Sequence, residues 1–230
     1  MKLYRFLHKL LAKFIRFFFN IKVIGKENEP KEGAVIVCAN HLSFFDVVIL
    51  GAALNRPLRF LAKKEVFKIP ILSGLIKALG AFPVDRSSVA SSANSVKTSL
   101  HLLSLGESVM LFPQGHRQAG HAPDEPEIQI KHGVGMMIKR SKAPVLPICI
   151  QSRKWTIRMF KRIYVSIGEP IYYEEFDFTE GGTEEYSEAS EKVFSHICSL
   201  IIKDKDVRSK KKKKASKKNK KRKKRGKASK

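Results

Sequence analysis

The sequence has few cysteines, and none lies close to another in the sequence. Three occur in 230 residues, at Cys38, Cys149 and Cys198, and no two of them form a C-x-x-C motif. A zinc ribbon, a dithiol redox motif and a disulfide framework all need more numerous or more closely spaced cysteines. We therefore expect three small buried residues in a protein of a reducing compartment such as the cytosol.

Long uncharged apolar runs are also missing. A membrane-spanning helix needs about 20 predominantly apolar residues, and the longest apolar stretch, residues 33–54, contains Asn40, His41 and Asp46. The N-terminus begins like a signal peptide, but basic residues recur through it and no small-residue cleavage site follows. Neither a spanning helix nor a cleaved leader is expected.

Acidic residues are scarce, above all at the C-terminus. The chain has 45 Lys and Arg against 21 Asp and Glu, a formal net charge of +24. Residues 208–230 hold 16 basic residues and no acidic one, which leaves +8 for residues 1–207. We expect residues 206–230 to be disordered, because such a tail repels itself and has almost no apolar residues to bury. Its expected role is attachment to an anionic membrane. Nucleic acid is a weaker alternative, since no aromatic residue is present to stack on bases.

Apolar and basic side chains separate onto opposite faces of a helical wheel drawn for residues 1–20. No acidic residue occurs before Glu27. This pattern is typical of a helix lying in a membrane interface, and it predicts a membrane-associating segment over residues 1–30. The alternative is an amphipathic helix packed on the domain. The apolar face comprises Leu3, Leu7, Leu10, Leu11, Phe14, Ile15 and Phe18, and the basic face comprises Lys2, Arg5, Lys9, Lys13 and Arg16.

Residues 31–205 alternate short apolar runs with helical patterns, and no internal repeat is visible. The alternation is typical of a single α/β domain with a largely parallel, mixed sheet flanked by helices. Sites in such sheets lie beyond the C-terminal ends of the strands. Strands are predicted at 34–39, 58–62, 81–84, 108–112, 145–150 and 163–167, and helices at 45–54, 69–79, 88–105, 128–140 and 186–202.

A histidine and an aspartate follow the first predicted strand, in the stretch N-H-L-S-F-F-D. His41 and Asp46 can meet if His41 occupies the turn before the helix and Asp46 its first turn, with Asn40 or Ser43 as the cap. Asp46 would then hold one imidazole nitrogen and leave the other as a general base. The alternative is a capping aspartate beside a surface histidine. Because no nucleophile elbow is present, the simplest chemistry is deprotonation of a substrate hydroxyl that attacks an activated carbonyl.

Two further clusters place an arginine just past a predicted strand. They are G-A-F-P-V-D-R, ending at Arg86, and F-P-Q-G-H-R, ending at Arg117. An arginine in this position suits a bidentate pair with phosphate, and a solvated loop charge is the alternative for each. A fourth stretch, A-P-V-L-P at 143–147, is an apolar strand entry without a reactive group.

In this order, the four clusters resemble the motifs of the PlsC-type glycerolipid acyltransferases, the 1-acyl-sn-glycerol-3-phosphate (lysophosphatidate) acyltransferases, over residues 33–170. The resemblance implies transfer of an acyl chain from a thioester to the sn-2 hydroxyl of lysophosphatidate, giving phosphatidate. It implies a peripheral or monotopic enzyme on the cytoplasmic face of the cell membrane. The donor would be an acyl carrier protein or coenzyme A thioester, with no metal and no other cofactor.

The resemblance also implies roles for individual residues. His41 corresponds to the catalytic base and Asp46 to its orienting partner. Lys63 stands in A-K-K-E, which looks like a stretch found in the family, where the lysine helps to bind the phosphate. The residues expected to bind substrate are Lys63, Arg86, Gln114, Gly115 and Arg117.

Two residues of the third cluster depart from the family pattern. Gln114 stands where Glu is usual, and His116 stands where Thr or Ser is usual. An amide keeps an acceptor oxygen but loses the charge, so the departure bears on the choice of acceptor more than on the reaction. The alternatives are an acyltransferase for another glycerolipid or lysophospholipid acceptor, and a non-enzymatic membrane- or nucleic-acid-binding protein on this scaffold.

Overall fold

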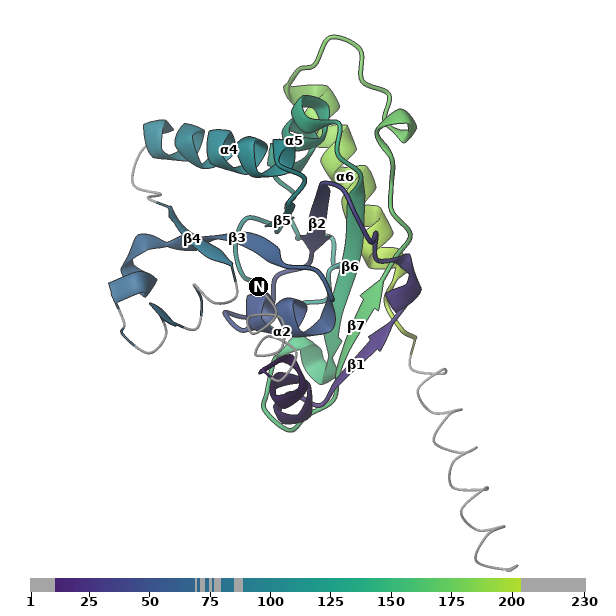
Figure 1. The fold of residues 1–230 in the computed structure, drawn as a ribbon. Coiled ribbons are helices and arrows are strands. Elements are labelled where there is room, and N and C mark those ends of the chain that lie inside the picture. The colour runs from purple at the N-terminus through teal and green to yellow at the C-terminus, as the bar shows by residue number, and fades with distance from the viewer. Residues whose placement is uncertain are drawn as a thin grey trace, which may run out of the picture. The chain divides into compact units, whose positions relative to one another are not determined.

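A seven-stranded mixed sheet forms the centre of the domain (Figure 1). The computed structural model describes residues 11–68, 70, 73–74, 76, 80–84 and 89–203. The strand order is β1-β7-β6-β2-β5-β3-β4, and neighbours are parallel except for the antiparallel pair of β6 and β7. The strands are β1 (Ile21–Ile24), β2 (Val35–Ala39), β3 (Leu58–Lys63), β4 (Ala81–Val84), β5 (Ser108–Leu111), β6 (Val145–Ser152) and β7 (Ile163–Ile167).

Helices cover both faces of this sheet (Figure 1). Helix α2 and a helical segment at residues 11–18 pack on one face, and α4, α5 and α6 lie on the other. The α-helices are α2 (Asp46–Ala53), α4 (Val89–Ser104), α5 (Gly133–Ser141) and α6 (Thr183–Ser199), and the short 3-10 helices are η1 (Lys26–Asn28), η2 (Lys64–Lys68), η3 (Arg153–Trp155) and η4 (Tyr173–Glu175).

The central strands are apolar along their whole length because both faces of the sheet are covered. Every residue of β2 is buried, and so is every residue of β6 except Gln151. Successive side chains of a strand point to opposite faces. Val35, Val37 and Ala39 accordingly join the core on the α2 side of the sheet, while the residues between them serve the other face. Continuous apolar runs therefore mark the strands that surround the site.

The predicted fold class is confirmed, and each of the six predicted strands is present. β1 escapes the sequence prediction, because I-K-V-I is short and carries a lysine, and only its parallel pairing with β7 defines it as a strand. Helix α5 begins at Gly133 instead of residue 128, since the Lys131 amide donates to the Pro113 carbonyl in a loop. Most of the helix predicted at 69–79 lies outside the described residues.

The chain divides into one compact unit that ends at Leu200 and a second that starts at Ile201. The segment expected at the membrane up to residue 30 contributes β1 to the sheet, so part of it belongs to the domain itself. The tail predicted to be disordered lies outside the described residues.

The N-terminal helix packs on the domain with part of its apolar face. Ile15 and Phe19 are buried in the core, whereas Phe14 and Phe17 are exposed. Arg16, expected among the headgroup-facing cations, instead donates from its guanidinium to the carbonyls of Ala52 (2.5 Å) and Ala53 (3.0 Å) at the end of α2. The predicted lipid-facing surface is therefore narrower than the wheel indicates. Within the described part of the chain, no helix has the length and apolar composition needed to cross a bilayer.

Candidate active site

Strand register brings two of the predicted clusters together at one edge of the sheet. β2 and β5 are adjacent and parallel, with Cys38 opposite Leu111. His41 lies three residues beyond Cys38, and Gln114 lies three residues beyond Leu111, so both segments leave the sheet side by side. β3 is the other neighbour of β5 and ends at Lys63 on the same edge. This is the edge where α/β sheets usually hold their ligands.

The predicted contact between His41 and Asp46 is present. The imidazole Nδ1 lies 2.8 Å from Asp46 Oδ2, and the aspartate is fully buried while the His41 side chain is 18% exposed. The same oxygen accepts hydrogen bonds from the amides of Leu42 (2.6 Å) and Ser43 (2.8 Å). Burial raises the pKa of the Asp46 carboxyl, and these hydrogen bonds oppose the rise. With Nδ1 donating to the carboxylate, Nε2 is the nitrogen left for a substrate.

The backbone and ring of His41 are held from three further directions. Its amide donates to Gln114 Oε1 at 2.7 Å, and its carbonyl accepts from the Gln118 amide at 2.7 Å. The Phe112 ring stacks on the imidazole with centroids 3.9 Å apart and planes 12° from parallel. Gln114 is predicted to bind substrate; its side chain is buried, and its Oε1 is the acceptor for the His41 amide. This hydrogen bond ties the third cluster to the His41 backbone.

Asn40 ties the turn before α2 to strand β6. Its Nδ2 donates to the Ile150 carbonyl (2.9 Å), and its Oδ1 accepts from the Ile150 amide (2.7 Å). The side chain thus replaces a backbone partner at the point where the chain leaves β2. The expectation that Asn40 caps α2 is wrong, because both polar atoms serve this cross-link. Ser43 Oγ accepts instead from the Phe45 amide at 3.2 Å in the turn ahead of the helix.

A cavity of about 210 Å³ opens beside His41. It lies among β3, β5, α4 and the start of α5, and its lining includes Phe60, Met110 and Met137. Lys131 contributes a cation to the same lining. A largely apolar cavity with a few polar groups suits a ligand with a hydrocarbon portion.

Of the remaining predicted residues, Gly115, Arg117 and Lys63 lie within the described part of the chain. Gly115 has a φ of 74°, a conformation that favours glycine, and a Cβ there would lie 3.2 Å from Lys131 Cγ. Arg117 is exposed two residues further along. Lys63 is the last residue of β3, and Arg86 lies outside the described residues.

The sequence missed three contributors to the site. The local sequence predicts only a capping role for Asn40, although its side chain anchors the turn to β6. Phe112 belongs to the F-P-Q-G-H-R cluster, so its presence was visible but its stacking role was not. Lys131 has no local signal, because it reaches the cavity from the far end of the loop that follows β5.

The cysteine closest to His41 in sequence is unsuited to nucleophilic attack. Cys38 is fully buried in β2, and burial raises the pKa of its thiol far above the ordinary range. Burial likewise raises the pKa of Cys149 to about 12. Because the thiolate is the reactive form, we assign no nucleophilic role to either cysteine.

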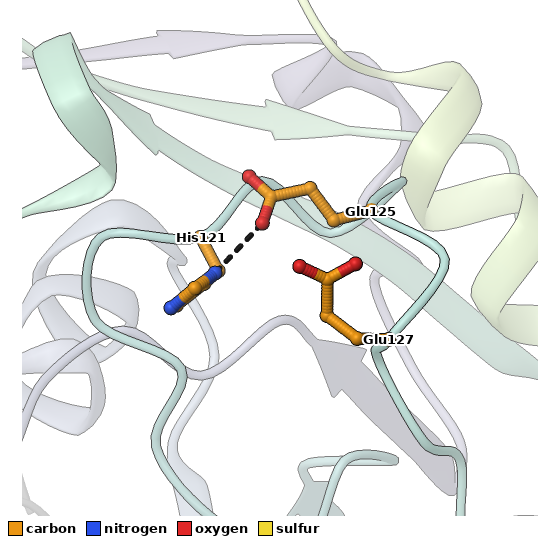
Figure 2. A group of neighbouring side chains, drawn as sticks. All are labelled: His121, Glu125 and Glu127. Atoms are coloured by element: carbon orange, nitrogen blue, oxygen red, sulfur yellow. Dashed lines mark hydrogen bonds and ion pairs between the residues drawn. The ribbon is translucent and has the colours of Figure 1, made fainter.

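One further group of possible metal ligands occurs among the described residues. Figure 2 shows His121, Glu125 and Glu127 directed toward one another, with their ligand atoms within 4.8 Å. Glu125 already accepts hydrogen bonds from the Ala122 amide (2.6 Å) and from His121 Nδ1 (2.7 Å), and these bonds lower its pKa. The hydrogen bonds of a surface turn account for this arrangement, so we assign no metal to it.

Comparisons with known proteins show which proteins this chain resembles. The family described as Acyltransferase matches residues 20–151. A 1-acyl-sn-glycerol-3-phosphate acyltransferase of Bacillus subtilis (strain 168) is 31% identical over 177 residues, which cover 76% of this chain and 85% of the relative. A chloroplast protein of the same description from Arabidopsis thaliana is 29% identical over 151 residues, 65% of this chain and 41% of the relative. The crystal structure of the 1-acyl-sn-glycerophosphate acyltransferase PlsC from Thermotoga maritima has the same fold, with a TM-score of 0.62 and 24% identity over 88% of this chain and 84% of that one.

Proposed function

The chain belongs to the PlsC-type acyltransferase family, and from this premise we propose that it acylates the sn-2 hydroxyl of 1-acylglycerol 3-phosphate to give phosphatidate. The name of the Bacillus relative supports this acceptor. The observation that carries the proposal is the pair of His41 and Asp46 beside a largely apolar cavity. A general base next to a hydrocarbon site is what acyl transfer to a lipid hydroxyl requires.

In the proposed reaction, His41 Nε2 removes the proton from the acceptor hydroxyl as its oxygen attacks the thioester carbonyl. The ester C–O bond forms, the C–S bond breaks, and the imidazolium returns its proton to the departing thiolate. Asp46 stabilises the imidazolium and keeps the proton of the neutral ring on Nδ1. Phe112 holds the ring plane by stacking.

Hydrogen-bond donors for the developing oxyanion belong to the third cluster in this proposal. The Leu42 and Ser43 amides already donate to Asp46, and the Gly115 amide donates to the Phe112 carbonyl. These three groups are therefore committed elsewhere. The amides of His116 and Arg117, which follow the left-handed turn at Gly115, are the candidates in this cluster.

The acyl chain would occupy the cavity, and basic side chains would bind the phosphate. The family motifs assign the phosphate to Lys63 and Arg86, and exposed Arg117 follows Gly115 on the same edge. Lys131 lines the cavity and adds a fourth cation. No metal or redox cofactor takes part in the proposed mechanism. The thiol carrier is acyl carrier protein or coenzyme A.

We place the protein on an anionic membrane surface, at the cytoplasmic face. Phe14 and Phe17 are exposed on the N-terminal helix, and the nearby side chain of Lys13 is exposed as well. Exposed aromatic residues beside cations are typical of an interfacial helix. The basic tail adds attraction to anionic headgroups in this scheme.

The direct test is acyl transfer by the purified full-length protein in anionic vesicles. Lysophosphatidate is offered with acyl-carrier-protein and coenzyme A thioesters, and His41→Ala is compared with His101→Ala, which changes an exposed histidine on α4. We expect phosphatidate from the wild type and from His101→Ala, and almost none from His41→Ala. Circular dichroism confirms that both variants fold. Full transfer by a folded His41→Ala would remove the assignment of the base.

Acceptor competition separates the proposed function from its main alternative. Gln114 stands behind His41 where the family usually has a carboxylate, so the charge next to the base differs in this chain. Glycerol 3-phosphate and lysophosphatidylglycerol are therefore added as rival acceptors. Preferential acylation of either rival would reassign the substrate while keeping the reaction. Absence of any product, with vesicle binding intact, would favour the binding-only alternative.

A further inference from the structure

The loop between β6 and β7 is rich in cations and free of acids. Residues 153–162 read R-K-W-T-I-R-M-F-K-R. At the tip of the loop, the side chains of Met159 and Phe160 are 57% and 60% exposed. Arg158, Lys161 and Arg162 around them are exposed too. Large apolar side chains that are grouped on a protein surface often mark an interaction site.

The backbone of this loop holds an unfavourable conformation. Lys154, Trp155 and Phe160 have φ angles of 63°, 53° and 59°, which bulky non-glycine residues seldom adopt. Such conformations persist where the surroundings impose them, and they concentrate at functional segments. Here the Phe160 amide donates to the Phe18 carbonyl at 2.8 Å, so the loop tip is fastened to the end of the N-terminal helix.

The loop tip and the N-terminal helix together form one surface. The Phe18 and Phe160 rings lie 4.9 Å apart, and the Phe14 and Phe18 rings lie 4.7 Å apart. Phe17, one turn from Phe14, is 75% exposed. We refer to this surface as the aromatic–basic face, which comprises Phe14, Phe17, Met159 and Phe160 with Lys13, Arg158, Lys161 and Arg162.

We propose that the β6–β7 loop is a second membrane-docking element, and that Met159 and Phe160 enter an anionic lipid interface beside the N-terminal helix. Apolar side chains enter the acyl boundary while the surrounding cations meet anionic headgroups. The face carries cations and no acid, so its charge complements an anionic bilayer. The inference rests on the proposed function, because that function requires an acceptor drawn from a membrane.

The same loop is connected to the site through residues 118–120, which contact both. The Gly120 amide donates to the Trp155 carbonyl (3.0 Å), and the Gln118 amide donates to the His41 carbonyl (2.7 Å). The segment that directly follows the third cluster thus contacts both the docking loop and the turn that holds His41. Docking through this loop would orient the cavity relative to the bilayer that supplies its substrate.

The single tryptophan of the chain, Trp155, is a native probe of this loop. Full-length protein is mixed with phosphatidylglycerol vesicles that contain phospholipids brominated along the acyl chain, which quench tryptophan only at short range. We expect quenching of Trp155 that is strongest for bromines near the headgroup. Absence of quenching in protein shown by sedimentation to be vesicle-bound would overturn the proposal.

A matched pair of substitutions tests the loop tip. Phe160→Asn suits a left-handed backbone, and the control Leu105→Asn removes an equally exposed apolar residue at the end of α4, 61% against 60% exposed. Vesicle binding is measured at 0.3 M salt, which screens the basic tail. We expect Phe160→Asn to weaken binding about fivefold, equivalent to roughly 1 kcal/mol, and Leu105→Asn to leave it unchanged. Equal binding by the two variants would overturn the proposal.

Two further readouts separate this inference from the proposed function. Acyl transfer to a short-chain lysophosphatidate dissolved below its critical micelle concentration needs no docking. If this transfer is intact and Trp155 is not quenched, the docking proposal fails while the proposed function stands. If transfer is absent and Trp155 is quenched, the proposed function fails while the docking proposal stands. Self-association that depends on Phe160, together with unchanged vesicle binding, would assign the face to contact between copies and overturn the proposal.

Discussion

Replacing Asp46 by asparagine separates the charge of this side chain from its hydrogen bonds. Three N–H groups donate to one oxygen, Oδ2: the His41 imidazole and the amides of Leu42 and Ser43. The other oxygen, Oδ1, is buried and has no hydrogen-bond partner among the described residues. An asparagine with its oxygen at the Oδ2 position keeps all three donors and the imidazole tautomer. The change therefore removes the negative charge while it keeps these three hydrogen bonds.

The size of the effect follows from this geometry. A hydrogen bond to a charged group contributes about 1.5–3 kcal/mol and a neutral one about 0.5–1.5 kcal/mol. The imidazolium of the transition state adds to the loss, so we expect kcat of Asp46→Asn to fall roughly ten- to a hundredfold. KM should change little, because Asp46 is fully buried and offers no surface to substrate. Asp46→Ala removes the acceptor as well, and we expect a fall of about a thousandfold or more.

The assay is initial-rate acyl transfer to lysophosphatidate with both thioester donors. Asp177→Asn serves as the matched control, because Asp177 is exposed. The new amide group lies where Oδ1 was buried, so the free energy of unfolding of Asp46→Asn should fall by about 1–3 kcal/mol in a denaturant titration. A wild-type kcat for folded Asp46→Asn would refute the role of the charge. An Asp46→Asn protein as inactive as Asp46→Ala would refute the inference that the oxygen alone orients the ring.

Three other predictions follow from buried contacts. Gln114→Ala leaves the His41 amide without its acceptor, so the free energy of unfolding should fall by about 1–3 kcal/mol; unchanged stability would show that the contact is absent in solution. Arg16→Met removes two hydrogen bonds from the end of α2 and should lower the free energy of unfolding by about 1–3 kcal/mol with little effect on vesicle binding. Lys13→Gln should instead weaken vesicle binding with little effect on the free energy of unfolding. Equal effects of the two on binding would contradict that assignment. Burial raises the pKa of the Cys38 thiol, so its stabilising contribution is complete below the unfolded pKa of about 8.5 and is lost as pH rises above it. Cys38→Ala should therefore flatten the fall in unfolding free energy above pH 8.5 by up to about 1.4 kcal/mol per pH unit, and an unchanged slope would count against it.

The local sequence predicts most of the strands because both faces of the sheet are covered, which requires continuous apolar runs. A strand such as β2, with V-I-V-C-A buried throughout, must be apolar at every position. The spacing of His41 and Asp46 likewise limits how they can meet, and Asp46 does begin α2. Strand β1 shows where this reasoning stops, since its four residues become a strand only through pairing with β7.

The amino-acid sequence by itself determined the order of six of the seven strands and of helices α2, α4, α5 and α6, and the local turn in which a histidine meets an aspartate. Both depend on residues close together in the chain. Tertiary structure alone decided that Gln114 supports the His41 backbone, because this contact arises from the adjacency of β2 and β5. It also decided which aromatic residues stay exposed: Ile15 packs inward, whereas Phe17 and the distant Phe160 remain at the surface. A helical wheel fixes neither outcome, because burial depends on the partner surface that folding brings to each face.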